Sequence, residues 1–143
     1  MSMKQLSIFV ENKAGRLAEI TTAIAAAGID IHALSIADTT NFGILRLIVN
    51  QPDKAEAALK SAGLTVSLTD VIAIGVEDQP GGFARAARVM SDAAIDIEYM
   101  YSFLHQDSGK AWIILRVADN GKALAALRAG GVEIMEEHRI TEA

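Results

Sequence analysis

Residues 8–15 read Ile8-Phe9-Val10-Glu11-Asn12-Lys13-Ala14-Gly15, and residues 74–81 read Ile74-Gly75-Val76-Glu77-Asp78-Gln79-Pro80-Gly81. The two stretches share alternating apolar positions, a glutamate and a closing glycine. The likeness continues on both sides, at an offset of 66 residues and then, beyond one loop, of 68. A repeat of this length that occurs only twice is too sparse for a solenoid array. It predicts a duplicated small domain, with residues 1–69 as the first copy and residues 70–143 as the second.

The first copy predicts the element order β-α-β-β-α-β. Apolar and polar residues alternate over residues 6–11, which is typical of a half-buried strand. After the turn at residues 12–15, Leu17, Ile20 and Ile24 recur at helical spacing, and Gly28 ends that helix. The other elements predicted for this copy are strands over Ile29–Asp38, Phe42–Asn50 and Leu64–Leu68, and a helix that Pro52 begins and Gly63 ends.

The second copy repeats this order, and only Thr69-Asp70 separates its first strand from the strand before it. Its predicted elements are a strand over Val71–Glu77, a helix carrying Phe83, Ala86, Met90 and Ala93, strands over Ile95–Leu104 and Lys110–Val117, a helix containing Ala123–Ala129, and a strand over Val132–Ile140. This order is the ferredoxin-like motif, an antiparallel sheet with both helices on one face. The sequence therefore predicts an α+β protein with two ferredoxin-like units in tandem.

The hairpin strands indicate which sheet face the helices cover. The residues expected on the helix side are Leu45, Leu47, Val49, Ile113, Leu115 and Val117. The opposite face is expected to expose Ile44, Arg46, Ile48, Trp112, Ile114 and Arg116. That second face is apolar apart from its arginines, so it predicts a partner surface. The other copy or a second chain would cover it, and a homodimer is expected.

Composition excludes several classes of function. The net charge of −5 and the pI of about 5.1 disfavour binding to nucleic acid or to an anionic membrane surface. Without cysteine there are no disulfides, thiolate nucleophiles or thiolate metal sites. The chain begins in a strand pattern rather than a signal peptide, and no apolar run reaches the length of a membrane span. A soluble cytoplasmic protein is expected.

The loop before the first helix of each copy could hold a ligand. Gly15 and Gly81 allow close approach to the backbone, and the free N–H groups of a first helical turn suit a small carboxylate. Asn12 and Asp78, three residues earlier, could meet an ammonium group, so the pair of features matches an amino acid. The alternative is that Asn12 and Asp78 only cap the helices while the glycines make the turn.

The element order, the loop at residues 77–83 and the strand opening Gly28-Ile29-Asp30-Ile31 together resemble the ACT domain, a small-molecule regulatory module. Residues 11–17 look like the same loop, with alanine at position 14 where the family usually has proline. The resemblance covers nearly the whole chain as two ACT units, and it implies binding of free amino acids between paired domains. The ligand contacts that it implies are Asn12 and Asp78 and, from the neighbouring domain, Asp30 and Asp96. The helix-start residues expected to bind the ligand carboxylate are Gly15, Arg16 and Leu17 in the first copy, and Gly81, Gly82 and Phe83 in the second. Aspartate at positions 30 and 96, where asparagine is common, would favour a cationic group on the ligand or simply face water.

Other residues give no catalytic or metal-binding pattern. His32, His105 and His138 sit at unrelated spacings, so neither a metal nor a cofactor is predicted. Four aromatic residues of the second hairpin could wall a pocket or pack in the core or a dimer; they are Tyr99, Tyr101, Phe103 and Trp112. No nucleophile-base set or carboxylate pair suggests an enzyme.

The predicted function is therefore a non-catalytic sensor that binds a free amino acid and transmits occupancy to a partner. The two loops differ in sequence, with Arg16 and Leu17 in the first where the second has Gly82 and Phe83. Only one of the two loops could therefore be able to bind the ligand. Two rival functions stay open. One is a regulatory subunit similar to the small subunit of acetolactate synthase, docked on a biosynthetic enzyme. The other is an acylphosphatase-type hydrolase, which would use Arg16. The sequence leaves open which amino acid is bound.

Overall fold

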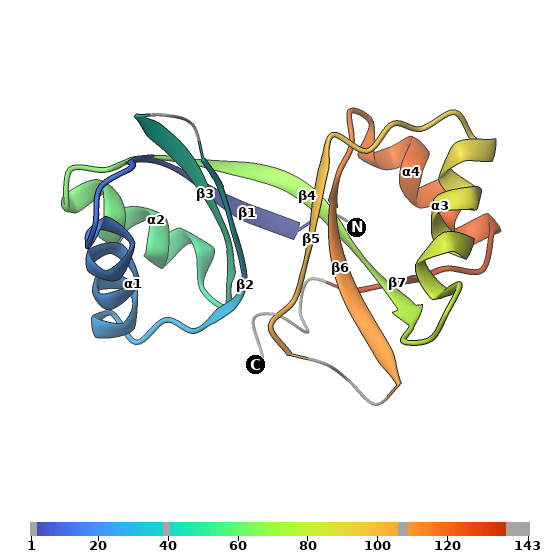
Figure 1. Ribbon diagram of the computed structural model, residues 1–143, viewed down its shortest axis with the longest axis horizontal. Helices are drawn as coiled ribbons and strands as arrows, with labels where there is room; N and C mark the ends of the chain where they lie inside the picture. Colours follow the sequence, from blue (N-terminus) through green and yellow to red (C-terminus); the bar gives the residue numbers. More distant parts are fainter. Residues whose placement is uncertain (1–2, 39–40, 106–108, 137–143) are drawn as a thin grey trace. The chain divides into compact units, whose positions relative to one another are not determined.

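The computed structural model describes residues 3–38, 41–105 and 109–136, and these residues form two compact units (Figure 1). The N-terminal unit is Lys4–Thr69. The C-terminal unit comprises Met3 and residues 70–136 of the described chain. Within the described residues, each unit has two helices and four strands, and one long strand contributes to both units.

The N-terminal unit has a four-stranded antiparallel sheet in the order β2-β3-β1-β4. Its elements are β1 (Met3–Glu11), α1 (Arg16–Ala26), β2 (Ile31–Asp38), β3 (Phe42–Val49), α2 (Pro52–Ser61) and the first part of β4 (Thr65–Glu77). Pro52 occupies the start of α2, where its missing N–H costs nothing. Both helices cover the same face of the sheet (Figure 1).

The C-terminal unit repeats that arrangement in the order β5-β6-β4-β7. Its elements are the second part of β4, α3 (Gly82–Asp92), β5 (Tyr99–Ser102), β6 (Lys110–Arg116), α4 (Asn120–Ala129) and β7 (Glu133–Ile134). Asp119 caps α4 by accepting a hydrogen bond from the N–H of Lys122 at 3.0 Å. The prediction of two ferredoxin-like α+β units in tandem is confirmed.

Each unit has one hydrophobic core, between its sheet and its two helices. All six residues predicted on the helix side of the hairpins belong to these cores, and the six predicted on the opposite face belong to neither. The prediction that the opposite face is exposed is wrong for three of its six residues, since Ile48, Trp112 and Ile114 are buried. Ile20 and Ile24 of α1 and Ala86 and Met90 of α3 are buried from the helix side. Leu17 belongs to the predicted stripe, but it lies in the first turn of α1 and is 40% exposed. The helical stripe therefore enters the core only from its second turn.

The last strand of the first copy and the first strand of the second are one continuous strand, β4. The prediction of two strands separated at Thr69-Asp70 is wrong. Neither residue is a glycine or a proline, so nothing in the backbone ends the strand there. The Thr69 hydroxyl lies 3.2 Å from that of Ser7, and Arg116 donates to the Asp70 carbonyl at 3.2 Å. Side-chain hydrogen bonds thus hold both residues along the extended path.

Two strands of the second copy are shorter than predicted. β5 begins only at Tyr99, because α3 ends in a turn in which Ala94 has a left-handed φ of 58° and the Ile95 N–H donates to the Met90 carbonyl. β7 ends at Ile134, and the remainder of the predicted strand over Val132–Ile140 lies partly outside the described residues. Among the described residues, no helix combines the length and the apolar run that crossing a membrane requires.

Candidate functional site

The loop before the first helix takes the same backbone path in both units. Gly15 and Gly81 are the N-cap residues of α1 and α3, with left-handed φ angles of 86° and 85° that other residues rarely adopt. The N–H groups of Arg16 and Gly82 close the turn with hydrogen bonds of 3.2 and 3.0 Å. The next two N–H groups of each helix have no acceptor within the helix, because the helix begins there. Each helix N-terminus therefore offers donors and a partial positive charge to an anion.

Asn12 and Asp78 tie these loops to the neighbouring hairpins. The Asn12 N–H donates to the Asn41 carbonyl and the Asp78 N–H to the Gly109 carbonyl, both at 2.9 Å. In the alternative interpretation, the part in which Asn12 and Asp78 cap the helices is wrong, because glycines hold the N-cap positions and make no side-chain cap bond. The part in which the glycines make the turn is confirmed by their left-handed φ angles. The side chains of Asn12 and Asp78 are exposed, so they remain accessible to a ligand.

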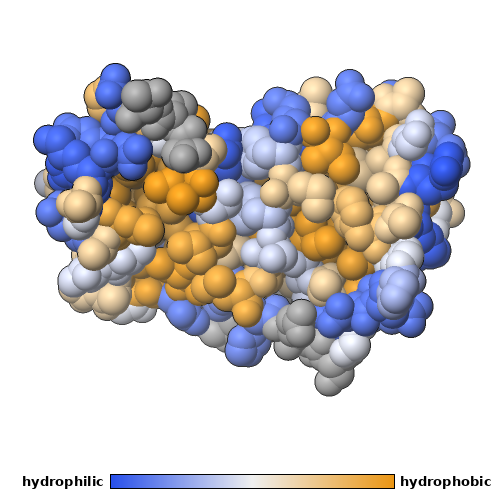
Figure 2. Space-filling model, in the orientation of Figure 1, coloured by the Kyte–Doolittle hydropathy of each residue, from blue (hydrophilic) through white to orange (hydrophobic). Residues whose placement is uncertain are grey.

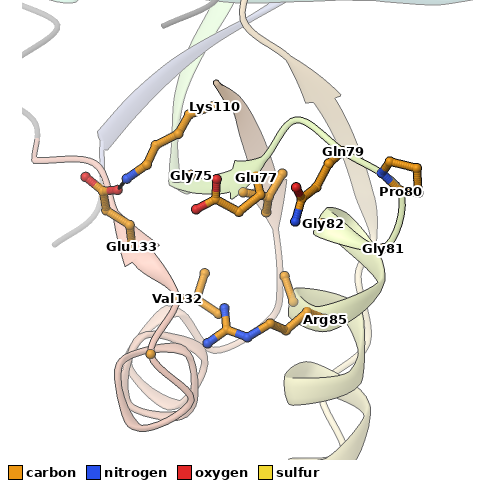
Figure 3. Close-up of a pocket in the computed structure, with 13 residues that line it drawn as sticks. Gly75, Glu77, Gln79, Pro80, Gly81, Gly82, Arg85, Lys110, Val132 and Glu133 are labelled. Carbon is orange, nitrogen blue, oxygen red and sulfur yellow. Dashed lines mark hydrogen bonds and ion pairs between the residues drawn. The ribbon is translucent and has the colours of Figure 1, made fainter. Parts of the chain in front are cut away.

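The C-terminal unit has a pocket of about 260 Å³ beside this loop (Figure 3). We call it the C-terminal pocket. It lies between the end of β4, the loop and first turns of α3, the start of β6, and the turn from α4 into β7. Its polar side chains are Glu77, Gln79, Arg85, Lys110 and Glu133. The pocket is therefore built from four segments that are distant in the sequence and that the ferredoxin-like topology brings to one place.

Charges of both signs line the C-terminal pocket. Lys110 and Glu133 form an ion pair at one side of it (Figure 3). The Nη2 of Arg85 donates to the carbonyl of Gly130 at 2.9 Å, which holds the guanidinium between the two helices. In Figure 3 the carboxylate of Glu77 and the guanidinium of Arg85 lie on opposite sides of the pocket. This arrangement can hold a ligand that carries one positive and one negative group.

Gly82 lets the loop pass unusually close to the end of β4. A Cβ atom placed at Gly82 would lie 1.8 Å from the carbonyl oxygen of Glu77, far inside van der Waals contact. On the opposite face of the sheet, the ring of Trp112 packs against Gly75, where a Cβ atom would lie 2.9 Å from ring carbons. Glycine at positions 75 and 82 thus sets the shape of the strand end that borders the pocket.

The N-terminal unit has a pocket of about 240 Å³, the N-terminal pocket, lined in part by Phe9, Glu11, Arg16 and Phe42. The two phenylalanine rings are stacked, with centroids 4.9 Å apart. Glu11 pairs with Lys13 at 3.0 Å and with Arg16 at 3.5 Å. The hydrogen bond from Lys13 and then its charge hold the pKa of Glu11 below its usual value, desolvation opposes them, and the charge of Arg16 adds a smaller lowering effect. The carboxylate of Glu11 therefore stays ionised at neutral pH.

The two pockets occupy equivalent places in the two copies but differ in chemistry. Glu11 and Gly63 correspond to Glu77 and Gly131, which are the same residue types. The lining positions that differ pair Phe9 with Gly75, Arg16 with Gly82, Phe42 with Lys110, Leu64 with Val132, and Thr65 with Glu133. Outside the N-terminal lining, Glu19 corresponds to Arg85. Arg16 is held between two carboxylates, since Glu19 lies 3.1 Å from it as well. Among the described residues, Arg85 has no carboxylate partner, so the C-terminal pocket alone offers an uncompensated cation.

The predicted site residues lie partly in these pockets. Gly81 and Gly82 line the C-terminal pocket and Arg16 lines the N-terminal one. The others do not line either pocket; they are Asn12, Gly15, Leu17, Asp30, Asp78, Phe83 and Asp96. The backbone N–H of Asp30 donates to the side chain of Asn50 at 3.0 Å, and Asp96 is exposed between α3 and β5. Their part in binding stays a prediction.

Sequence reasoning missed the ionic residues of the C-terminal pocket. Arg85 lies one helical turn after Gly82, so helical spacing alone could have placed it beside the loop. Lys110 and Glu133 come from the start of β6 and from β7, and their approach depends on the packed sheet. The one sequence signal for Lys110 and Glu133 was the alignment of the two copies, in which these charged residues correspond to the uncharged Phe42 and Thr65.

The remaining candidates form no metal centre within the described residues. No group of three or more metal-binding side chains occurs there. His32 lies 3.9 Å from the carboxylate of Asp30, His105 is exposed, and His138 lies outside the described residues. Tyr99 and Tyr101 stack on each other at 6.5 Å along β5 and do not line the C-terminal pocket. Of the two readings for these aromatics, packing is the one that the contacts support.

Comparison with known proteins gives consistent matches over the whole chain. The family model described as an ACT domain pair matches residues 1–142. The crystal structure of protein BT0572 from Bacteroides thetaiotaomicron is 38% identical, with a TM-score of 0.93 over 100% of this chain and 98% of that one. The ligand-free regulatory subunit of aspartate kinase from Thermus thermophilus is 18% identical, with a TM-score of 0.68 over 90% of this chain and 89% of that one. The corresponding subunit from Thermus flavus is 15% identical, with a TM-score of 0.63 over 92% and 94%. The two aspartate kinase subunits have the same fold as this chain. No curated protein matches the chain.

Proposed function

The chain belongs to the family of ACT domain pairs, and on that premise we propose that it is a sensor that binds a free amino acid and catalyses no reaction itself. ACT domains are regulatory, non-catalytic modules. The observation that carries the proposal is the C-terminal pocket, in which a helix N-terminus and Arg85 face Glu77 across a space of about 260 Å³. A free amino acid is a small metabolite that carries one anion and one cation.

The proposed pose follows from the charges. The ligand carboxylate lies at the N-terminus of α3, where it accepts hydrogen bonds from the first-turn N–H groups and from Arg85. A guanidinium has five donors, so Arg85 can bind the ligand while Nη2 keeps its bond to Gly130. The ammonium group lies near Glu77, with Asp78 as the second carboxylate in reach from the same loop. Asn12 has the corresponding role if the N-terminal loop binds a ligand of this kind.

A sensor also needs a partner to which it transmits occupancy. β2 and β5 lie at the edges of their sheets, and Ile36 and Met100 on these strands are 51% and 42% exposed. Edge strands with apolar side chains pair readily with another chain. We propose a second copy of this chain as the partner, with a biosynthetic enzyme as the alternative. Ligand binding would then favour one pairing over another through its different affinity for the two states.

The test is a thermal-shift screen of the twenty amino acids against the full chain. A ligand at about 100 times its Kd stabilises the native state by roughly 2.7 kcal/mol. At roughly 2–4 °C per kcal/mol for a chain of this size, the expected rise in Tm is about 5–10 °C for the true ligand. Chemically unrelated amino acids should produce no shift at the same concentration.

Variants of Asn12 and Asp78 test whether the thermal shift depends on the predicted loops. With Asn12→Ala and Asp78→Ala combined, the shift should disappear because the ammonium group loses part of its anionic environment. Since both side chains are exposed, the double variant should melt close to the parent in the absence of ligand. A full shift in the double variant would show that these loop side chains take no part, and no shift with any amino acid in the parent would reject the proposed function.

A further inference from the structure

The N-terminal pocket has an aromatic wall that the C-terminal pocket lacks. Phe9 and Phe42 stack with an interplanar angle of 17°, yet they are 51% and 42% exposed. Five of the seven large apolar side chains exposed among the described residues belong to the N-terminal unit, and Figure 2 shows apolar surface gathered there. Aromatic faces left in water beside a pocket are unfavourable unless something covers them.

A charged group stands next to that wall. The guanidinium of Arg16 lies 3.5 Å from the carboxylate of Glu11 and 3.1 Å from that of Glu19. The pair with Glu19 is the exposed one, since the Glu19 side chain is 69% exposed, and exposed pairs contribute little to stability, so a ligand carboxylate can replace Glu19 at small cost. The planar guanidinium suits such a carboxylate because it can donate two parallel hydrogen bonds.

These features differ from the C-terminal pocket at the positions that decide ligand chemistry. Phe42 stands where the other pocket has Lys110, and Phe9 stands where it has Gly75. A small polar zwitterion would leave both phenylalanine rings in water, whereas a planar apolar group would cover them. We propose that the N-terminal pocket is a second binding site, which takes a small aromatic carboxylate whose ring packs on Phe9 and Phe42 and whose carboxylate binds Arg16.

The size of the pocket limits the ligand. Drug-sized ligands occupy roughly 300–1,000 Å³. The N-terminal pocket of about 240 Å³ holds one aromatic ring with a short acidic side chain. The proposal does not depend on amino-acid binding in the C-terminal pocket, since the two sites have no lining residue in common.

The probe for this site is phenylacetate, compared with phenethylamine and with acetate. Saturation-transfer NMR detects contact with the ring, and isothermal titration gives the Kd on the full chain. We expect phenylacetate to bind, and phenethylamine and acetate to bind at least about tenfold more weakly, because each lacks one of the two recognised groups. Phe42→Ala and Arg16→Gln should each weaken phenylacetate binding about tenfold for the same reason.

Three variants make the result decisive. Phe9→Ala should repeat the effect of Phe42→Ala, so a folding defect in one variant does not leave the question open. Ile36→Ala removes an equally exposed apolar side chain that does not line the pocket, and it should leave the Kd unchanged. Arg85→Ala should also leave phenylacetate binding unchanged while weakening amino-acid binding, which separates failure of this proposal from failure of the proposed function. Equal binding of phenylacetate and phenethylamine, or an unchanged Kd in both phenylalanine variants, would overturn the second site.

Discussion

Gly82→Ala is expected to lower the free energy of unfolding by about 1–3 kcal/mol, the usual cost of forcing extra volume into a packed site. The new Cβ atom would lie 1.8 Å from the carbonyl oxygen and 2.9 Å from the carbonyl carbon of Glu77. Both are backbone atoms, so no side-chain rotation relieves the overlap. The end of β4 and the start of α3 must move apart, which also displaces the N–H groups proposed to bind the ligand carboxylate. Urea denaturation measures the first effect, and the amino-acid thermal shift measures the second.

Gly121→Ala is the matched control. Gly121 also lies in the first turn of a helix, α4, but a Cβ atom there would meet only the Asp119 carboxylate, at 3.5 Å. Replacing such a glycine by alanine usually stabilises a protein by about 0.4–1 kcal/mol. The two alanine variants should therefore change stability in opposite directions. If Gly82→Ala is as stable as Gly121→Ala and still binds the amino acid, the close approach of the loop to β4 is needed neither for stability nor for binding.

Arg85→Ala is expected to weaken amino-acid binding about 10–100-fold, since hydrogen bonds to a charged group contribute roughly 1.5–3 kcal/mol. The guanidinium is the one cation of the C-terminal pocket without a carboxylate partner among the described residues. Arg85→Lys should fall between parent and alanine variant, because it keeps the charge but loses the planar arrangement of donors. Isothermal titration with the amino acid found by thermal shift measures both variants.

Arg88→Ala controls for the loss of charge on the same helix. Arg88 lies one turn further along α3, is exposed and does not line the pocket. Arg88→Ala should change the Kd for the amino acid less than Arg85→Lys does. Equal weakening by Arg85→Ala and Arg88→Ala would mean that only the overall charge of the helix matters, and the proposed contact between Arg85 and the ligand carboxylate would then be wrong.

The sequence predicted most of the fold because its signals were local and were repeated. Alternation in β3 and β6 placed Leu47 and Leu115 in the cores, and glycines marked the helix N-termini correctly. The errors arose where hydrogen bonds that the apolar pattern does not encode set the path of the backbone. Thr69-Asp70 looked like a junction but continues β4, and Ile95 has strand propensity but follows a left-handed turn at Ala94. Apolar periodicity contains no information about either feature.

The candidate site was less accessible from the sequence than the fold. The loop around Gly81 was predicted, because turn chemistry and the helix start lie within a few residues of each other. Lys110 and Glu133 become neighbours of that loop only after β6 and β7 have paired with β4. The stacked pair Phe9 and Phe42 likewise requires the pairing of β1 with β3, which sets Phe42 opposite Glu11. A search for sequence motifs does not find such side chains, because they are distant in the sequence and become neighbours only through strand pairing.

The most direct test of the account is to locate the bound amino acid by ¹H–¹⁵N NMR titration of the full chain. With the amino acid that raises the Tm most, the account predicts the largest shift changes at the backbone amides of Gly81, Gly82 and Arg85. The equivalent amides of Gly15, Arg16 and Glu19 serve as the internal reference, and they should change much less. Changes centred on Gly15–Glu19, or on residues remote from both loops, would contradict the C-terminal pocket as the site of amino-acid binding.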